Sequence, residues 1–242
     1  MGKLKALIQF ECVTTLKFLV IFYCIEYSIL AVTFFLTYLG RGSVTHPYFA
    51  CMELCSVIFI FIFGLFGFRE DFKMLMQNGF TRKYIFLATV VMFVQTAALL
   101  AVVDTIAAGV LTGLSPGYIS GFEAVYGPGQ AWWIQLLSRF ALYMVMVCFG
   151  YVGAVLSTRI GKKRMMIVGI TLWCLLFVVV PVIFNVILSD TMRYNVATFI
   201  YSCAGFTDHG DIRFDCPMLS MLVFISIGFG GAFAMIRRAP LR

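Results

Sequence analysis

Ionisable side chains interrupt the long apolar stretches of this 242-residue sequence, and a charge inside hydrocarbon needs a partner or a function. If these stretches are membrane-spanning helices that rise about 1.5 Å per residue, Glu53, Asp104 and Arg139 share one depth near the outer surface. Arg139 can then form an ion pair with Glu53 or with Asp104. The alternative is that each side chain extends separately toward the lipid headgroups.

Glu26 lies deeper, about 14 Å above Lys17 and therefore near the middle of a membrane. No basic residue shares its depth, and Gln95 is the nearest polar candidate. Glu26 is then protonated, faces a water-filled path, or bonds to a neighbouring chain. Asn185 lies one helical turn after the kink expected at Pro181. It is the last of the polar residues predicted to lie in the membrane or along a transport path.

The composition indicates that membrane-spanning helices position these residues. Hydrophobic residues make up 62% of the chain and charged residues 12%, whereas soluble domains average about 45–50% and about 25%. A soluble enzyme is excluded, and the continuous apolar runs exclude alternating β-barrel strands. Small residues such as Gly64 and Gly150 let helices pack closely, within one chain or between two. The net charge of +7 requires no nucleic acid, because membrane proteins collect Lys and Arg in cytoplasmic loops.

We predict an all-α polytopic membrane protein with one transmembrane domain over residues 1–242. A membrane span needs about 20 apolar residues. Six apolar runs have about that length: 18–39, 49–68, 84–111, 132–155, 165–188 and 218–235. Residues 1–17 predict an amphipathic helix in the membrane interface, and the alternative is a frayed basic tail. Of the 18 Lys and Arg, 14 fall on the side of the termini and 3 on the other, so both termini are cytoplasmic.

The loop between the second and third runs has the pattern of a short amphipathic helix. Two acidic residues favour a helix N-terminus, three apolar residues follow at spacings i, i+3 and i+4, and an Asn-Gly pair signals the stop. In chain order these residues are Glu70, Asp71, Phe72, Leu75, Met76, Asn78 and Gly79. The exposed apolar residues of so short a helix suit a groove on a protein partner. The alternative is an ordinary loop with its aromatic residues in the headgroup layer.

Two further segments are expected on the external side. Residues 112–131 are rich in Gly and Pro and predict a turn-rich loop. Residues 190–217 contain a semi-apolar stretch too short to span, which predicts a pair of re-entrant or interfacial helices. Cys203 and Cys216 flank a polar turn there, and they either form a disulfide or remain free thiols.

Motifs for independent catalysis are not evident. The sequence has no nucleotide-binding loop of the form GxxxxGK[ST], and no HExxH or CxxC metal motif. We therefore expect that the chain is not an enzyme and that it holds no metal or cofactor of its own.

The order of these elements, and above all residues 68–86 with the sequence FREDFKMLMQNGFTRKYIF, resembles the permease subunit of a type-2 ABC exporter. The resemblance is to the small bacterial class whose ATPase is a separate chain. It implies that 70–78 form a coupling helix seated on that ATPase, that 2–12 form an elbow helix, and that 190–217 close the path outside. It also implies two ATPase copies carrying ATP and Mg, and a second permease chain, identical or paralogous, in the cytoplasmic membrane.

The resemblance implies alternating access driven by ATP, with an amphipathic substrate such as a peptide, a drug or a lipid-like molecule. Small permeases of this kind often serve antimicrobial-peptide export or resistance. The alternatives are a secondary transporter, a membrane-embedded enzyme, and a structural or sensory subunit without transport. A secondary transporter should show paired intramembrane charges and inverted repeats, whereas the sequence shows one midplane carboxylate and no repeat.

Overall fold

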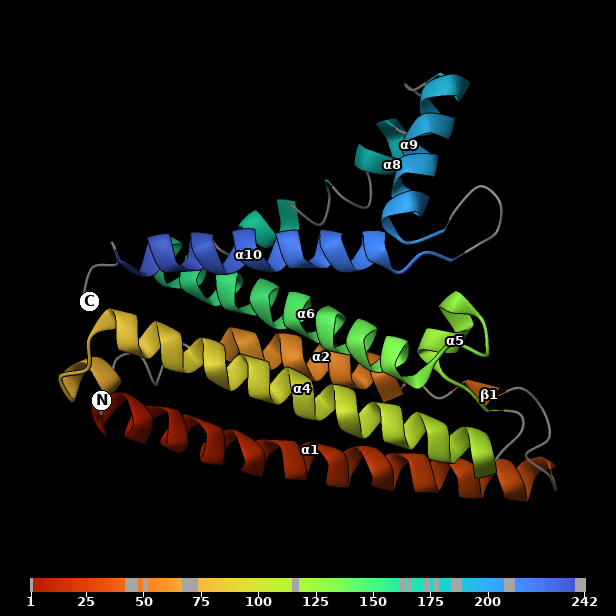
Figure 1. Ribbon diagram of the computed structural model, residues 1–242, viewed down its shortest axis with the longest axis horizontal. Helices are drawn as coiled ribbons and strands as arrows, with labels where there is room; N and C mark the ends of the chain where they lie inside the picture. The colour runs from red at the N-terminus through yellow and green to blue at the C-terminus, as the bar shows by residue number, and fades with distance from the viewer. Residues whose placement is uncertain are drawn as a thin grey trace.

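Long helices lie side by side and run lengthwise through the molecule (Figure 1). The structure is a computed structural model, and it describes residues 2–41, 48–49, 52–66, 74–114, 118–161, 164, 167–171, 175, 179–183, 189–206 and 212–237. The named elements are α1 (Gly2–Arg41), β1 (Tyr48–Phe49), α2 (Met52–Phe66), α4 (Arg82–Leu114), β2 (Tyr118–Ile119), α5 (Gly121–Tyr126), α6 (Trp132–Ile160), α8 (Val180–Val182), α9 (Asp190–Cys203) and α10 (Asp215–Arg237).

Four of the described helices, α1, α4, α6 and α10, are long and apolar enough to cross a membrane. The chain is therefore a helical, multi-pass membrane protein. These helices correspond to the first, third, fourth and sixth predicted spans. α2 is shorter than the predicted span 49–68, since its 15 residues cover about 22 Å at about 1.5 Å each. Most of the predicted span 165–188 lies outside the described residues.

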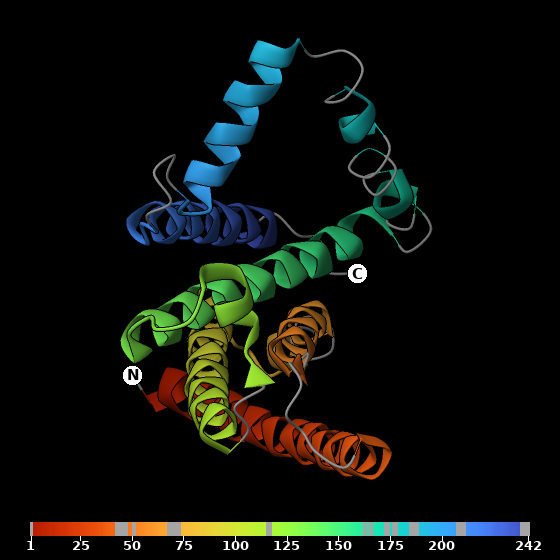
Figure 2. The ribbon, with the colours of Figure 1, turned by 90° about the vertical axis from the view of Figure 1, so that its right-hand side faces the viewer.

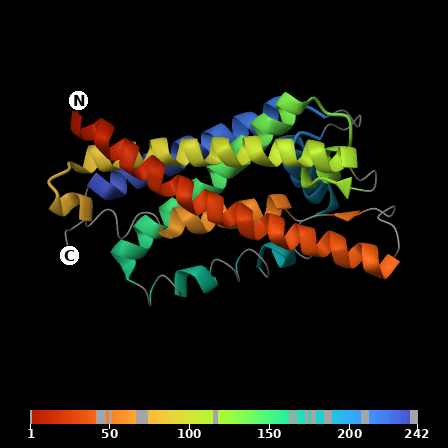
Figure 3. The same cartoon turned by 90° about the horizontal axis from the view of Figure 1, so that it is seen from below.

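α1 is one continuous helix of 40 residues, so the separate interfacial helix expected over residues 1–17 does not form within it. The physical reason is visible in the sequence. Residues 3–39 contain neither glycine nor proline, so no residue interrupts the helical hydrogen bonds. α1 crosses the bundle diagonally beneath α4, and its first turns lie at the end where α4 begins and α10 ends (Figure 3).

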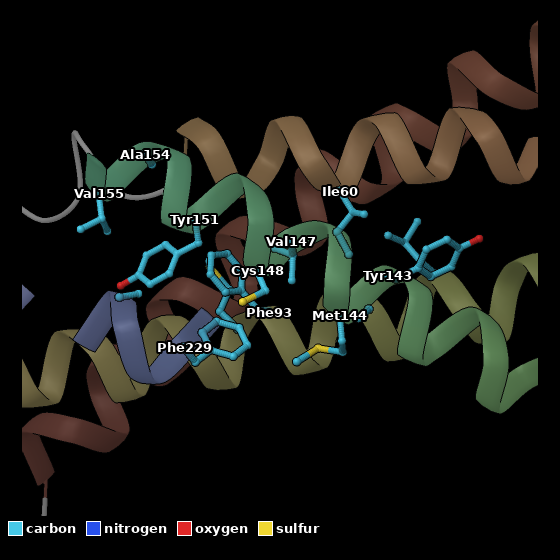
Figure 4. Packing of buried hydrophobic residues seen from close by; sticks show 14 of the residues in the cluster. Ile60, Phe93, Tyr143, Met144, Val147, Cys148, Tyr151, Ala154, Val155 and Phe229 are labelled. Atoms are coloured by element: carbon cyan, nitrogen blue, oxygen red, sulfur yellow. The ribbon is translucent and has the colours of Figure 1, made fainter. Parts of the chain in front are cut away.

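α6 is the central helix of the hydrophobic core and packs against α2, α4 and α10. Figure 4 shows its buried side chains meeting residues from those three helices. The rings of Tyr151 and Phe93 meet edge to face with 5.3 Å between their centroids, and Phe229 of α10 lies 6.3 Å from Phe93. Aromatic packing of this kind fixes how α6 is rotated against its neighbours.

α2 and α6 approach each other most closely at two glycines. A Cβ atom on Gly64 would lie 2.5 Å from the carbonyl oxygen of Val147, and a Cβ atom on Gly150 would overlap the carbonyl oxygen of Phe61. Only a residue without a side chain permits this approach. The two glycines predicted to allow close packing therefore do so within one chain.

The end of the bundle opposite to the termini is closed by short elements. β1 and β2 pair in parallel, with Tyr48 opposite Tyr118. The segment 112–131, predicted to be a turn-rich loop, instead contains β2 and α5. Ser120 and Glu123 form a capping box at the start of α5, which explains why a helix begins in this Gly-rich stretch.

α9 leaves the bundle at a steep angle to α10 (Figures 1 and 2). Residues 190–217 thus supply one described helix, followed by a bridge between Phe206 and Ile212, in place of the expected helix pair. α5 connects this segment to the bundle. The Tyr126 hydroxyl donates to the carbonyl oxygen of Ala204 at 3.1 Å, and its ring stacks on Phe206.

Candidate functional site

Arg139 of α6 forms an ion pair with Glu53 of α2. Its Nη2 and Nε lie 2.5 Å and 2.9 Å from the same Glu53 oxygen, Oε1. The side chain of Arg139 is 3% exposed and that of Glu53 is 16% exposed. Of the two partners that the sequence left open, the structure therefore selects Glu53, and the two side chains do not extend separately.

The ion pair is held by groups from four helices. Arg139 Nη1 donates to the Thr105 hydroxyl at 3.1 Å and to the Gln135 side-chain oxygen at 3.3 Å. The backbone N–H of Phe122 donates to Glu53 Oε2 at 2.9 Å. The Phe122 ring lies 5.7 Å from the guanidinium carbon, within cation–π range. The pair therefore connects α2, α4 and α6 and fixes α5 above them.

Tyr118 of β2 is buried near this ion pair. Burial, and after it the nearby Glu53 carboxylate, raises the pKa of Tyr118 to about 12. Its hydroxyl is therefore neutral near pH 7 and cannot act as a base there. The contribution of Tyr118 is to pack β2 against the end of the bundle.

Asp104 of α4 is bound by two tyrosines and not by Arg139. Tyr143 of α6 donates to Oδ2 at 2.5 Å, and Tyr23 of α1 donates to Oδ1 at 2.9 Å. Sequence reasoning missed both tyrosines, although helical spacing marks them. Tyr23 precedes Glu26 by three residues and Tyr143 follows Arg139 by four, so each shares a helix face with an ionisable residue.

Glu26 of α1 is buried without a hydrogen bond. It is 6% exposed, and within the described part of the chain neither of its carboxyl oxygens has a hydrogen-bonding partner. The predicted neighbour Gln95 therefore does not bind it. Asp104 lies at a similar height, because Tyr23, three residues before Glu26 on α1, donates to Asp104 at 2.9 Å. A buried carboxyl group without a partner is costly, and such groups in native proteins point to a function.

We expect that a Glu26→Met variant is more stable than the wild-type protein. Methionine keeps the approximate volume of the side chain and removes a buried unpaired polar group that costs about 1–3 kcal/mol. Thermal unfolding in detergent measures the effect. Asp104→Leu is the control, because it removes the acceptor of the Tyr143 hydroxyl and the shorter of the two hydrogen bonds of the Tyr23 hydroxyl, so it should lower the stability. A loss of stability in Glu26→Met as large as in the control would mean that Glu26 has a bonding partner.

The predicted cytoplasmic helix is described from residue 74 onward. Glu70, Asp71 and Phe72 lie outside the described residues. Residues 74–77 form a helical turn, and its end confirms the stop predicted from Asn78 and Gly79. Gly79 has a φ of 75°, and the backbone N–H groups of Gly79 and Phe80 close a Schellman motif on the preceding turn.

Leu75 points into the bundle and not toward a partner. It is buried with Leu7 of α1 and Ile85 of α4, and Met76 packs against the same cluster. The expectation that Leu75 is available to another protein is therefore wrong. It is buried because the first turns of α1 and α4 offer apolar surface on either side of it. The exposed apolar residue of the turn is Met74 and not Leu75.

The remaining predicted site residues are not brought together. Asn185 lies outside the described residues. Cys203 and Cys216 are both free thiols. Among the described residues, no group of three or more His, Cys, Asp or Glu side chains is placed to hold a metal ion. Residues 113–117 match the hydrolase pattern Gly-x-Ser-x-Gly, but that pattern requires a strand before the serine and a helix after it, whereas α4 precedes it and β2 follows.

Comparisons with protein-family models, curated proteins and solved structures give no match. The chain itself defines a helical multi-pass membrane protein with ionisable side chains buried among α1, α2, α4 and α6. In such proteins, buried ionisable groups commonly belong to substrate or ion pathways.

Proposed function

We propose that the chain is the permease subunit of an ATP-driven exporter of the type-2 ABC class. The observation that carries the proposal is the helical turn 74–77, which Leu75 fixes to the end of the bundle where α1 and α4 begin. One face of the turn is bound to the bundle, and the other leaves Met74 and Gln77 exposed, which is where the proposed partner would bind. The resemblance of residues 68–86 to the coupling region of that class supports the same assignment.

The contacts of the turn supply a route from ATP hydrolysis to the membrane helices. Because packed interiors are nearly incompressible, a displacement of the turn moves Leu7 and Ile85, which belong to α1 and α4. The same two helices carry Glu26 and Asp104. In the proposed complex, two ATPase chains bind ATP and Mg and close on each other. Closure draws together the turns of two permease chains, identical or paralogous, and alternates access between the two faces of the cytoplasmic membrane.

The proposed substrate is amphipathic: a peptide, a drug or a lipid-like molecule. Glu26 offers a carboxyl group without a hydrogen bond to the described residues, in a bundle whose core is mostly apolar, and this combination suits a molecule with both a basic group and an apolar face. Membrane-active peptides, which carry Lys and Arg opposite an apolar face, have this chemistry. A role in antimicrobial-peptide resistance in bacteria follows from this choice of substrate.

A Met74→Glu/Gln77→Glu variant should fail to couple to the ATPase. The two added charges face the proposed protein groove and must be desolvated there, so we expect a loss of copurification and at least a tenfold fall in transporter-stimulated ATP hydrolysis. The assay co-expresses the chain with an ABC ATPase encoded beside it, whose presence is itself expected. Gln9→Glu is the control, since it adds a negative charge at an exposed position near the start of α1, outside the turn. Normal complex formation and hydrolysis in the double variant would contradict the proposal.

A secondary transporter is the second candidate, and one observation favours it. The sequence places Glu26 alone near the midplane, but Tyr23, three residues before Glu26 on α1, donates to Asp104 at 2.9 Å, so folding brings the two carboxyl groups to similar heights in the bundle. Proton-coupled carriers use such groups. The two candidates differ in their energy source. The exporter needs the ATPase and ATP, whereas the carrier needs only a proton gradient. Proton uptake by vesicles containing only this chain, abolished by Glu26→Gln, would favour the carrier over the exporter.

A further inference from the structure

A pocket of about 480 Å³ lies between the start of α4 and the end of α10. These two helix ends lie at the end of the bundle where α1 also begins (Figures 1 and 3). The residues that line the pocket are Thr81, Arg82, Lys83, Tyr84, Phe233, Ile236 and Arg237. Three of these residues are cations, none is acidic, and most of the others are apolar or aromatic.

Arg82 holds the pocket together from one side. Its Nη1 donates to the carbonyl oxygen of Arg237 at 2.9 Å and reaches that of Ile236 at 3.4 Å. These carbonyls belong to the last turn of α10, where a helix leaves its carbonyl groups without helical partners and where cations are favoured. The guanidinium therefore fixes α4 to α10, and Arg82 lines the same pocket as Lys83 and Arg237.

The part of the pocket next to these cations is lined by aromatic and apolar side chains. Tyr84, Phe233 and Ile236 lie next to the cations, and Phe233 packs on Phe86 at 5.0 Å between ring centroids. Contact with these apolar and aromatic side chains would not stabilise a bound inorganic anion such as phosphate. A molecule with an anionic head and a hydrocarbon chain is complementary to both parts.

We propose that this pocket binds an anionic phospholipid of the cytoplasmic leaflet. The phosphate and the headgroup lie against Lys83, Arg237 and the guanidinium of Arg82, and the start of an acyl chain lies along Phe233 and Ile236. The leaflet follows from the excess of Lys and Arg at this end of the bundle, which marks the cytoplasmic side. Basic pockets between membrane helices on that side recognise acidic headgroups. The proposal does not depend on the transported substrate or on the ATPase.

The test titrates the purified chain in detergent with phosphatidylglycerol or with phosphatidylcholine of the same acyl chains and counts bound lipids by native mass spectrometry. We expect phosphatidylglycerol to be retained and phosphatidylcholine to be lost. A Lys83→Gln/Arg237→Gln variant should bind phosphatidylglycerol at least tenfold more weakly, while its weak binding of phosphatidylcholine stays unchanged. Arg82 is left intact because it joins the two helices.

The matched control is Lys5→Gln/Lys17→Gln, which removes the same charge from exposed positions on α1 outside the pocket. The control should keep wild-type lipid binding. An equal loss in the control, or equal retention of the two lipids by the wild-type chain, would overturn the proposal in favour of a diffuse charge effect. Displacement of the lipid by millimolar inorganic phosphate would overturn it in favour of a simple anion site.

Discussion

An Arg139→Gln variant should lose about 3 kcal/mol of folding free energy, because it leaves the Glu53 carboxylate without its cation in a largely buried position. The loss also removes the hydrogen bonds to Thr105 and Gln135, so α4 and α6 lose a direct connection. The measurement is thermal unfolding in detergent, together with the amount of protein in the membrane. We expect a markedly lower unfolding temperature and reduced accumulation.

Two controls test whether the effect comes from the burial of this ion pair. Arg193 and Asp190 form a pair on α9 at 3.5 Å, with the Asp190 side chain 97% exposed, so Asp190→Asn should change stability little. A Glu53→Gln/Arg139→Gln double variant removes both charges and should recover part of the stability lost in the single variant. If the single Arg139→Gln variant unfolds at the wild-type temperature, the ion pair does not form as described.

A Gly150→Ala variant should separate α2 from α6. The new methyl group would meet the carbonyl oxygen of Phe61, which is backbone and cannot rotate away. Overpacking of this kind costs about 1–3 kcal/mol, and the helices must also move apart along their whole contact. Since Glu53 lies on α2 and Arg139 on α6, the same variant should weaken their pairing. Thermal unfolding and disulfide cross-linking between cysteines introduced into the two helices measure the two effects.

Gly109→Ala and Gly230→Ala provide the comparison for this variant. A Cβ atom on either glycine would meet nothing within 4 Å, so both variants should be neutral or slightly stabilising, as alanine is the better helix former. An unfolding temperature of Gly150→Ala equal to that of these controls would mean that α2 and α6 are not in close contact.

The long helices were predictable from the sequence, but the pairing of their polar groups was only partly so. Depth along each helix placed Glu53, Asp104 and Arg139 at one level, because the rise per residue is fixed. Depth cannot choose between two carboxylates at the same level. That choice depends on how each helix is rotated, and rotation is set by packing such as that of Tyr151 and Phe93.

Other features were missed for identifiable reasons. The continuity of α1 could have been predicted, because residues 3–39 contain neither glycine nor proline. The sequence suggested two elements because charged and apolar residues are mixed up to residue 17, whereas residues 18–39 are mostly apolar. The burial of Leu75 could not have been predicted, because an apolar face on a short helix is the same whether its own chain or another protein covers it. That Glu26 has no hydrogen-bonding partner among the described residues is likewise a property of the assembled bundle.

The connection between Glu53 and Arg139 also has a consequence for biosynthesis. The two residues are 86 positions apart in the chain. At about 5–20 residues per second, a ribosome completes Arg139 roughly 4–17 s after Glu53. During that interval α2, a helix of only 15 residues, must be accommodated at the translocation machinery with its carboxylate uncompensated. α6 supplies that cation, so we expect α2 to reach its final position only after this later helix has entered the membrane.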